Sequence, residues 1–484
     1  MESYWSVYFR ASGPVASLEA AFLARGRIRS ADAARSVRRA KWFTRLHGNA
    51  AMYLSAIGQR RVPYMTPDAL HERRDARIRR MVRHAARYVP HYRSLFRTEG
   101  IDPGRIRTFG DLQRLPLLRK ADVRADPHSF RSEAPVARHA IPFLTSGSSG
   151  APLNVYHDPA SLLANIAFGL RVRPLLERHG VTRSSSRQLY IGYPGSTLQN
   201  VWRAHDEWAI APMRPERCFV SLLDPVEAVI SAINGFRPDV IYGYGTYLEH
   251  FARLVHSRGL HLHSPKAIVY GAEVMTELGR RMIEQDLGIP VYSDYAAVEV
   301  FKLAFSCEAN NGLHVHEDLS PTWIARADGD RAAAGERGEV VVSNLVNHGT
   351  VLLNYCLGDV AAATTAACPC GRTLPMLTDL EGRVEDTIVL PDGRFLHPRA
   401  VWMIVRRRPA VIRYQLVQHA ALLFELRLVT SDAAVFAQVA PEVTNDLEAI
   451  LGAESHVEAT FHEDLPLGAG GKFRMVVALP SGAQ

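Results

Sequence analysis

The chain has 484 residues, of which 47% are hydrophobic and 22% charged, a composition typical of a globular protein with about two to four domains. No stretch reaches the roughly 18 apolar residues that a membrane helix requires, and charged residues interrupt the apolar stretches near the N-terminus, which argues against a secretory signal. Five cysteines in so long a chain do not indicate a disulfide framework, so we expect a protein of the reducing cytoplasm. Because no apolar stretch is long enough to span a membrane, we also expect no membrane partner.

The formal net charge is +8, and much of it comes from arginines in the first 100 residues. Such a basic face could bind nucleic acid or an anionic carrier. However, apolar residues recur at helical spacing in the most basic stretch, at Ile78, Met81, Val82, Ala85 and Val89. We therefore interpret this stretch as a helix with one buried stripe and a solvated basic face, and we expect no nucleic-acid partner.

In chain order, residues 1–65 are rich in Ala and Arg and predict a helical N-terminal extension, and the helical period continues to about residue 90.

The next distinctive feature is the run 146–150, which contains only serine and glycine. Small residues allow backbone and hydroxyl donors to approach a polyphosphate closely. A flexible linker is the alternative interpretation, and the run is not a P-loop because no Gly-Lys-Ser/Thr follows it.

From about residue 187 the pattern alternates between strands and helices. We predict strands at 188–192, 239–243, 267–271 and 290–295, with helices at 246–258 and 275–287. This alternation indicates a mostly parallel sheet, in which ligands bind at the carboxyl ends of the strands. The residues just after Gly243, Gly271 and Tyr295 are therefore candidates for a binding site.

From about residue 313 short alternating strands predict a β-rich subdomain, and the last hundred residues predict a small α+β domain. The expected fold class is α/β: a large N-terminal domain with mostly parallel sheets and a β-rich subdomain, followed by a small mobile α+β C-terminal domain. The predicted boundaries are 1–65 for the extension, 66–382 for the large domain and 383–484 for the small one.

Seven motifs, in this order, resemble those of the adenylate-forming ligases, and more closely those of the phenylacetate–CoA ligase-like branch. The resemblance covers residues from about 65 to 484 and implies a phosphate loop, an acyl pocket, two adenine-binding strand ends, a ribose-binding aspartate, a hinge and a lysine loop. The corresponding segments are 145–150, 242–248, 270–273, 295–299, 354–359, 382–386 and 471–474.

The resemblance implies an enzyme in which a carboxylate attacks the α-phosphorus of ATP to give an acyl adenylate and pyrophosphate. Lys472 and Glu299 are then the catalytic residues, with Glu299 also binding Mg²⁺, and Glu385 lies in the hinge. The acyl pocket is assigned to Tyr242, Gly243, Tyr244 and Tyr247, although these tyrosines could equally be core residues. The residues assigned to the nucleotide are Thr145, Ser146, Gly147, Ser148, Ser149, Gly150, Gly271, Ala272, Glu273, Tyr295, Ala296, Asp359 and Arg383.

The acid is expected to be small, with aromatic acids as the candidate class, and the acyl acceptor is CoA, an amine or a carrier protein. Two alternatives stay open: nucleotidyl transfer to a non-carboxylate substrate, and an inactive scaffold that keeps the fold. Members of this branch often form homodimers, so a homodimer is also possible for this chain, and its oligomeric state stays open.

The chain departs from the family pattern at several positions. Asn354 and Cys356 replace two arginines on either side of Tyr355, Val298 replaces a threonine before the metal-binding acid, and Ala151 follows the phosphate loop. Loss of positive charge near the phosphates should weaken ATP binding or transfer that task to other residues.

Four of the five cysteines lie between residues 307 and 370, two of them in the tight pair Cys368-Pro-Cys370. One Zn²⁺ could bind Cys307, His314, Cys368 and Cys370 in a tetrahedral structural site. His316 is a second candidate histidine, and we expect His314 to be the ligand. Buried thiols beside a turn are the alternative interpretation.

Overall fold

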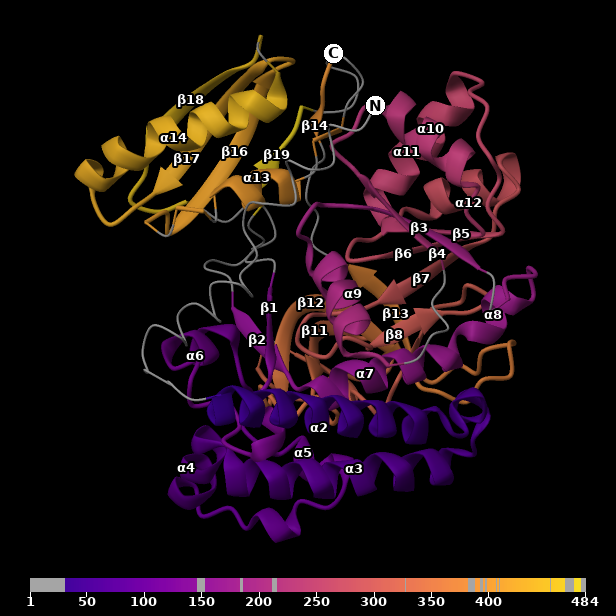
Figure 1. Ribbon diagram of the computed structural model, residues 1–484, viewed down its shortest axis with the longest axis vertical. Coiled ribbons are helices and arrows are strands. Elements are labelled where there is room, and N and C mark those ends of the chain that lie inside the picture. The colour runs from indigo at the N-terminus through magenta and orange to yellow at the C-terminus, as the bar shows by residue number, and fades with distance from the viewer. Residues whose placement is uncertain are drawn as a thin grey trace.

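The structure is a computed structural model, which describes residues 31–145, 153–182, 186–210, 216–326, 328–381, 388–391, 395–396, 398–405, 407–408, 410–452, 454–465 and 474–479. The expected α/β fold class is confirmed (Figure 1). The predicted boundary at residues 382–383 lies outside the described residues.

One large sheet of eleven strands forms the centre of the molecule, in the order β10-β11-β12-β13-β9-β8-β7-β6-β5-β3-β4. Five neighbouring strands are parallel, and the central ones carry runs of buried apolar residues, as expected where helices cover both faces of a sheet. They are β3 (Arg187–Gly192), β4 (Glu216–Ser221), β5 (Val240–Tyr244), β6 (Ala267–Gly271) and β7 (Val291–Tyr295).

The predicted β-rich subdomain continues this same sheet. Strand β8 pairs antiparallel with β7, with Asp294 opposite Phe305 and Tyr295 opposite Ala304, and the remaining strands follow outward. The end of β7 is therefore the point at which the sheet changes from parallel to antiparallel. The antiparallel strands are β8 (Ala304–Ser306), β9 (Leu313–Val315), β10 (Thr322–Ala325), β11 (Arg337–Val342), β12 (Tyr355–Thr364) and β13 (Met376–Glu381).

Helices lie before and between the parallel strands in sequence and cover them, as the alternation predicts. They are α7 (Pro159–Phe168), α8 (Arg173–Glu177), α9 (Thr197–Trp208), α10 (Val226–Phe236), α11 (Gly245–Ser257) and α12 (Glu277–Asp286), with η4 (Gly169–Arg171) between α7 and α8. The turn from β5 into α11 requires a glycine, because a Cβ atom at Gly245 would lie 2.7 Å from the carbonyl oxygen of Glu273.

The N-terminal region is helical and lies along one side of the sheet (Figure 1). Its long helices end where prolines and caps predict: α3 ends at Tyr88, and α4 begins at Pro90. The elements are α2 (Ala31–Ala56), η1 (Gln59–Tyr64), α3 (Pro67–Tyr88), α4 (Pro90–Thr98), η2 (Pro103–Arg105), α5 (Phe109–Leu112), α6 (Lys120–Ala125) and η3 (Pro135–Ala137), followed by the hairpin of β1 (Ile141–Leu144) and β2 (Asn154–His157).

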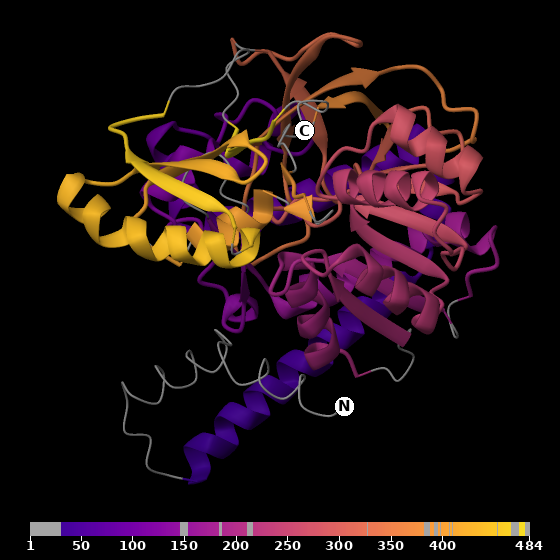
Figure 2. The same ribbon diagram turned by 90° about the horizontal axis from the view of Figure 1, so that it is seen from above.

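The C-terminal part forms its own four-stranded sheet, in the order β18-β17-β16-β19, and it lies to one side of the large sheet (Figures 1 and 2). Helix α14 (Ala433–Leu451) packs on this sheet through Ala440, Val443 and Leu447. The other elements are β14 (Ile388–Val389), β15 (Phe395–Leu396), α13 (Pro398–Val405), β16 (Arg413–Ala420), β17 (Leu423–Val429), β18 (His456–Phe461) and β19 (Val476–Val477).

Candidate active site

The serine and glycine run lies between β1 and β2. Residues 146–152, which include Ser146, Gly147, Ser148, Ser149 and Gly150, lie outside the described residues, but both ends of the run are described. The Thr145 amide donates to the carbonyl oxygen of Leu153 at 2.9 Å, and the Leu153 amide donates to Thr145 Oγ1 at 3.0 Å. Thr145 is buried. The two ends are therefore held together as the base of a hairpin loop.

The β1–β2 hairpin is fastened to the segment that follows β7. His157 Nε2 lies 2.7 Å from the Val298 carbonyl oxygen, and its ring stacks on Phe301 with 3.8 Å between ring centres. Burial lowers the pKa of His157 from the usual 6.5 to about 4, so the ring is neutral at pH 7 and Nε2 carries the proton that it donates. The contact brings the base of the loop close to Glu299.

Glu299 is held by two other parts of the large sheet. Its carbonyl oxygen accepts a hydrogen bond from Asn344 Nδ2 at 2.7 Å, and Oε1 accepts one from the hydroxyl of Tyr355 on β12 at 3.3 Å. Both Glu299 and Tyr355 are buried. Among the described residues the carboxylate is bound through Oε1, which leaves Oε2 for a cation.

Asp359 on β12 and Tyr295 at the end of β7 meet, although three strands lie between β12 and β7 in the sheet and 64 residues separate the two in sequence. The Tyr295 hydroxyl donates to Asp359 Oδ2 at 2.7 Å. Gly358 has a φ of +83°, a left-handed conformation that glycine adopts without strain, and it turns the chain just before Asp359. A carboxylate that is held through one oxygen keeps the other oxygen for a ligand, such as a pair of hydroxyl groups.

The end of β6 lies beside this group. A Cβ atom at Gly271 would lie 2.7 Å from the carbonyl oxygen of Asp294, so only glycine permits this close approach of β6 to β7. Ala272 follows with a φ of +63°, and Thr246 Oγ1 on α11 donates to Glu273 Oε2. Ala272 and Ala296, at the ends of adjacent strands, are both exposed to solvent.

The tyrosines assigned to an acyl pocket differ in their surroundings. Tyr242 stacks on Tyr190 of β3 with 4.5 Å between ring centres, and Trp202 of α9 contacts Tyr190 edge to face. Gly243 lies between Tyr242 and Tyr244 on β5, and a Cβ atom at this position would lie only 3.1 Å from Leu248 Cδ1. Tyr244 and Tyr247 are buried in the apolar core.

Sequence reasoning missed Tyr190 and Trp202. Tyr190 lies within a continuously apolar strand, where nothing in the sequence separates a pocket wall from a core residue. Arg383, Glu385 and Lys472 lie outside the described residues, so their assignments remain predictions.

The two positions at which arginines are replaced do not face Glu299. Asn354 is buried, and its amide accepts a hydrogen bond from Trp323 Nε1 at 2.9 Å and donates one to the carbonyl oxygen of Leu115 at 2.6 Å. Cys356 packs in an apolar cluster with Trp323. Tyr355 points to the opposite side of the strand, because successive side chains alternate. These replacements leave the Glu299 side of β12 unchanged.

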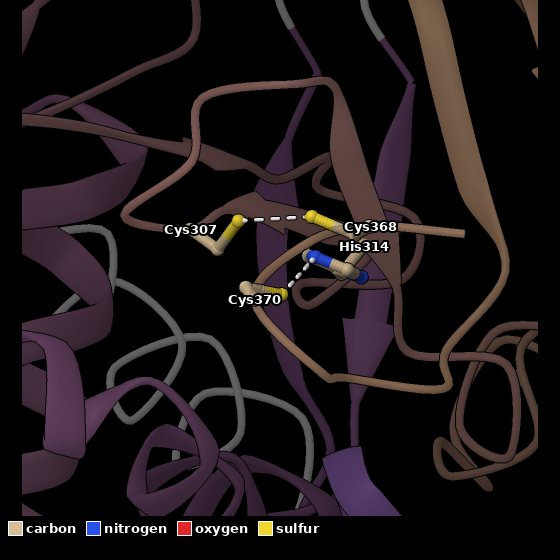
Figure 3. A group of neighbouring side chains, drawn as sticks. All are labelled: Cys307, His314, Cys368 and Cys370. Atoms are coloured by element: carbon tan, nitrogen blue, oxygen red, sulfur yellow. Dashed lines mark hydrogen bonds between the residues drawn. The ribbon is translucent and has the colours of Figure 1, made fainter. Parts of the chain in front are cut away.

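The four predicted zinc ligands come together from three separate segments (Figure 3). Their ligand atoms all lie within 4.8 Å of one another, with 3.5 Å between the sulfurs of Cys307 and Cys368 and 3.3 Å between Cys370 Sγ and His314 Nε2. Tetrahedral zinc with Zn–S bonds near 2.3 Å places sulfurs about 3.8 Å apart, so the donor set fits this ion. His316 instead faces Arg171.

Backbone amides complete the surroundings of two of the thiols. The amide of Ala309 donates to Cys307 Sγ at 3.4 Å, and the amide of Arg372 donates to Cys370 Sγ at 3.5 Å. Gly371, with a φ of +77°, makes the turn that allows the second contact. Such N–H donors stabilise thiolates, the form of cysteine that binds metal.

The buried, neutral state of His157 predicts a loss of stability in acid. The unfolded chain takes up a proton near pH 6.5, whereas folded His157 takes one up only near pH 4, so the folded state loses stability as the pH falls between these values. Between pH 7 and pH 5, His157 alone should lower the free energy of unfolding by about 2 kcal/mol. His157→Gln keeps a donor for Val298 and should reduce the fall in melting temperature between pH 7 and pH 5.

The matched control is His261→Gln, because His261 is an exposed histidine. If the two variants and the wild type show the same dependence of melting temperature on pH, His157 does not carry this effect.

Comparison with known proteins supports the resemblance. No family model matches the sequence. A phenylacetate-coenzyme A ligase of Thermus thermophilus is 27% identical over 398 residues, which cover 78% of this chain and 85% of the relative. A phenylacetate-coenzyme A ligase of Aromatoleum evansii is 26% identical over 354 residues, covering 71% and 76%.

Among solved structures, a 2-hydroxyisobutyryl-CoA ligase in complex with 2-HIB-AMP and CoA has a TM-score of 0.58 at 20% identity, with 86% of this chain and 91% of that chain covered. The same ligase in an open conformation has a TM-score of 0.53. The chain is thus a distant relative of the phenylacetate–coenzyme A ligases, and it has the fold of the adenylate-forming ligases.

Proposed function

We propose that this protein is an ATP-dependent ligase that converts a small carboxylic acid to an acyl adenylate and transfers the acyl group to a thiol or an amine. The observation that carries the proposal is the convergence at the end of β7. There the base of the serine and glycine loop, the Glu299 carboxylate and the Asp359 carboxylate are joined to one short segment, residues 295–301, by the hydrogen bonds described above.

Each of these groups has a task in adenylation. A carboxylate oxygen of the acid attacks the α-phosphorus, and the bond from this phosphorus to the oxygen of the departing pyrophosphate breaks. The loop 146–150 would bind the phosphates through its amide and hydroxyl donors, and Asp359 would accept hydrogen bonds from the ribose hydroxyls. Glu299 would hold Mg²⁺, which supplies charge neutralisation on the phosphates.

In the second step the sulfur or nitrogen of the acceptor attacks the acyl carbonyl carbon, and AMP leaves. Coenzyme A is the first acceptor to test, because the curated relatives are named as coenzyme A ligases. Aromatic acids are the first substrates to test, because Tyr242, Tyr190 and Trp202 form an aromatic group that would fit a ring beside the end of β5.

Mass spectrometry of reactions with ATP, Mg²⁺ and a pool of aryl and short-chain acids, with and without CoA, tests this function. We expect acid-dependent AMP and pyrophosphate, and a product whose mass identifies the acid and the acceptor. Lys472→Ala should reduce acyl-adenylate formation by at least about 100-fold, because it removes the cation that the resemblance places between the carboxylate and the α-phosphate.

Lys266→Ala is the control for Lys472→Ala, since Lys266 forms a surface ion pair with Asp239. ATP binding without AMP release for any acid would contradict the ligase and favour a non-carboxylate substrate.

The hydrogen bond between Tyr295 and Asp359 predicts a specific effect on ATP. Tyr295→Phe removes the donor that orients the Asp359 carboxylate, and the KM for ATP should rise about tenfold, which corresponds to ~1.4 kcal/mol for a hydrogen bond to a charged group. Steady-state kinetics measure this change. Tyr292→Phe is the matched control, because its hydroxyl on the same strand lies 2.8 Å from His179. An equal rise in both variants would mean that the orientation of Asp359 is not the cause.

We further propose that Cys307, His314, Cys368 and Cys370 bind one structural Zn²⁺. The site would tie β9 to the segments after β8 and before β13, and the adjoining Thr373 amide donates to the Pro63 carbonyl oxygen of η1 at 2.9 Å. Elemental analysis should find about one zinc per chain. Cys370→Ser should lower the zinc content and the melting temperature together, because metal binding contributes to folding.

Cys218→Ser, which changes a thiol on β4 at the far end of the sheet, should alter neither quantity. Purified wild-type protein that is fully folded without metal would contradict the zinc site.

A further inference from the structure

Helix α2 carries its large apolar side chains on the face that points away from the protein. They recur at spacings of three, four and seven residues, so they form one stripe along the helix. Their exposed fractions lie between 39% and 73%. We call this set the α2 stripe: Trp42, Phe43, Leu46, Tyr53 and Leu54 on the helix, with Ile57 in the turn directly after it.

The opposite face of α2 is fixed to the protein, so the helix cannot rotate to bury the stripe. A Cβ atom at Gly48 would lie 3.0 Å from Leu163 Cδ1, which shows how closely α2 approaches α7. Asn49 Nδ2 donates to the carbonyl oxygen of Trp208 at 2.9 Å, and Arg45 donates to the carbonyl oxygen of Ala209 at 2.9 Å. Asn49, Gly48 and Met52 thus face inward, and the residues of the α2 stripe face solvent.

The positive charge of the chain is concentrated in the same region. Residues 1–61 contain 11 Lys and Arg residues but 3 Asp and Glu residues, whereas the other 423 residues contain 46 of each kind. The whole net charge of +8 therefore lies in the first 61 residues. The N-terminal end of α2 projects beyond the body of the molecule (Figure 2), and its sequence contains Arg35, Arg38 and Arg39.

We propose that α2 lies on the surface of a membrane that contains anionic phospholipids. Apolar and aromatic side chains would enter the headgroup region, and the arginines would bind lipid phosphates, which is the arrangement of an amphipathic interfacial helix. This proposal revises the expectation of no membrane partner, which rested on the lack of a spanning segment. No described helix is long and apolar enough to cross a bilayer, and a helix that lies on the surface does not need to be.

A second copy of the chain is the other occupant that the stripe could accept, because its spacing also suits a helix pair. Charge disfavours this occupant, since two copies would bring two segments of +8 together. An anionic surface instead attracts the same charge.

Flotation of the full-length protein with phospholipid vesicles tests the proposal. We expect binding to phosphatidylcholine vesicles that contain about 30% phosphatidylserine, at least tenfold weaker binding to phosphatidylcholine alone, and at least tenfold weaker binding in 0.5 M NaCl, because salt screens the attraction. The double variant Phe43→Ser, Leu54→Ser should bind at least tenfold more weakly, since it removes two exposed apolar groups of the stripe.

Leu278→Ser is the matched control, because Leu278 is equally exposed but lies on α12. The second variant, Arg35→Gln with Arg39→Gln, should weaken binding several-fold and reduce its salt dependence without a change in apolar area. Equal binding to both kinds of vesicle, no binding, or unchanged binding of both double variants would overturn the proposal. A dimer that the Phe43→Ser, Leu54→Ser variant converts to a monomer would also overturn it, because a second copy would then cover the stripe.

Discussion

The short connection between β7 and β8 is the constraint on which the arrangement of the candidate active site depends. At this connection the sheet changes from parallel to antiparallel, so the chain must turn within residues 296–303. Phe301 takes a φ of +58° in this turn, and the stacked ring of His157 covers it. Strain at a non-glycine residue persists only where its surroundings hold it, and it is commonly found at functional sites.

Three consequences follow from this connection. The carbonyl oxygen of Val298 holds the hairpin that carries the serine and glycine loop, and the hydroxyl of Tyr295 holds Asp359 on β12. Glu299 lies between them in sequence, and hydrogen bonds hold both its carbonyl oxygen and its carboxylate. Adenylation brings a carboxylate anion to a polyphosphate anion, so rigid placement of these groups matters more than covalent assistance from the protein.

The parallel half of the sheet and the positions of its strand ends could be predicted from sequence, because apolar strands and amphipathic helices alternate with clear periods. The meeting of Cys307, His314, Cys368 and Cys370 could be predicted as well, because the tight pair Cys368-Pro-Cys370 supplies two of the four ligands that a tetrahedral zinc site requires. Other features depend on tertiary contacts that a single sequence does not contain. The continuation of the parallel half into one eleven-stranded sheet depends on the pairing of β7 with β8.

The environments of individual residues were the hardest to predict. Asn354 was expected to leave a gap in positive charge near the phosphates, but its side chain is buried in a hydrogen-bond network on the other side of β12. The α2 stripe has the periodicity of a buried helix face, and sequence alone does not show that Gly48 and Asn49, rather than the stripe, pack against the protein.

The most direct measurement of the central claim is calorimetric titration of wild-type protein and Asp359→Ala with ATP and Mg²⁺. Saturable binding to the wild type and at least tenfold weaker binding to the variant are predicted, whereas equal affinity for both proteins, or no saturable binding to the wild type, would contradict a nucleotide site at the end of β7.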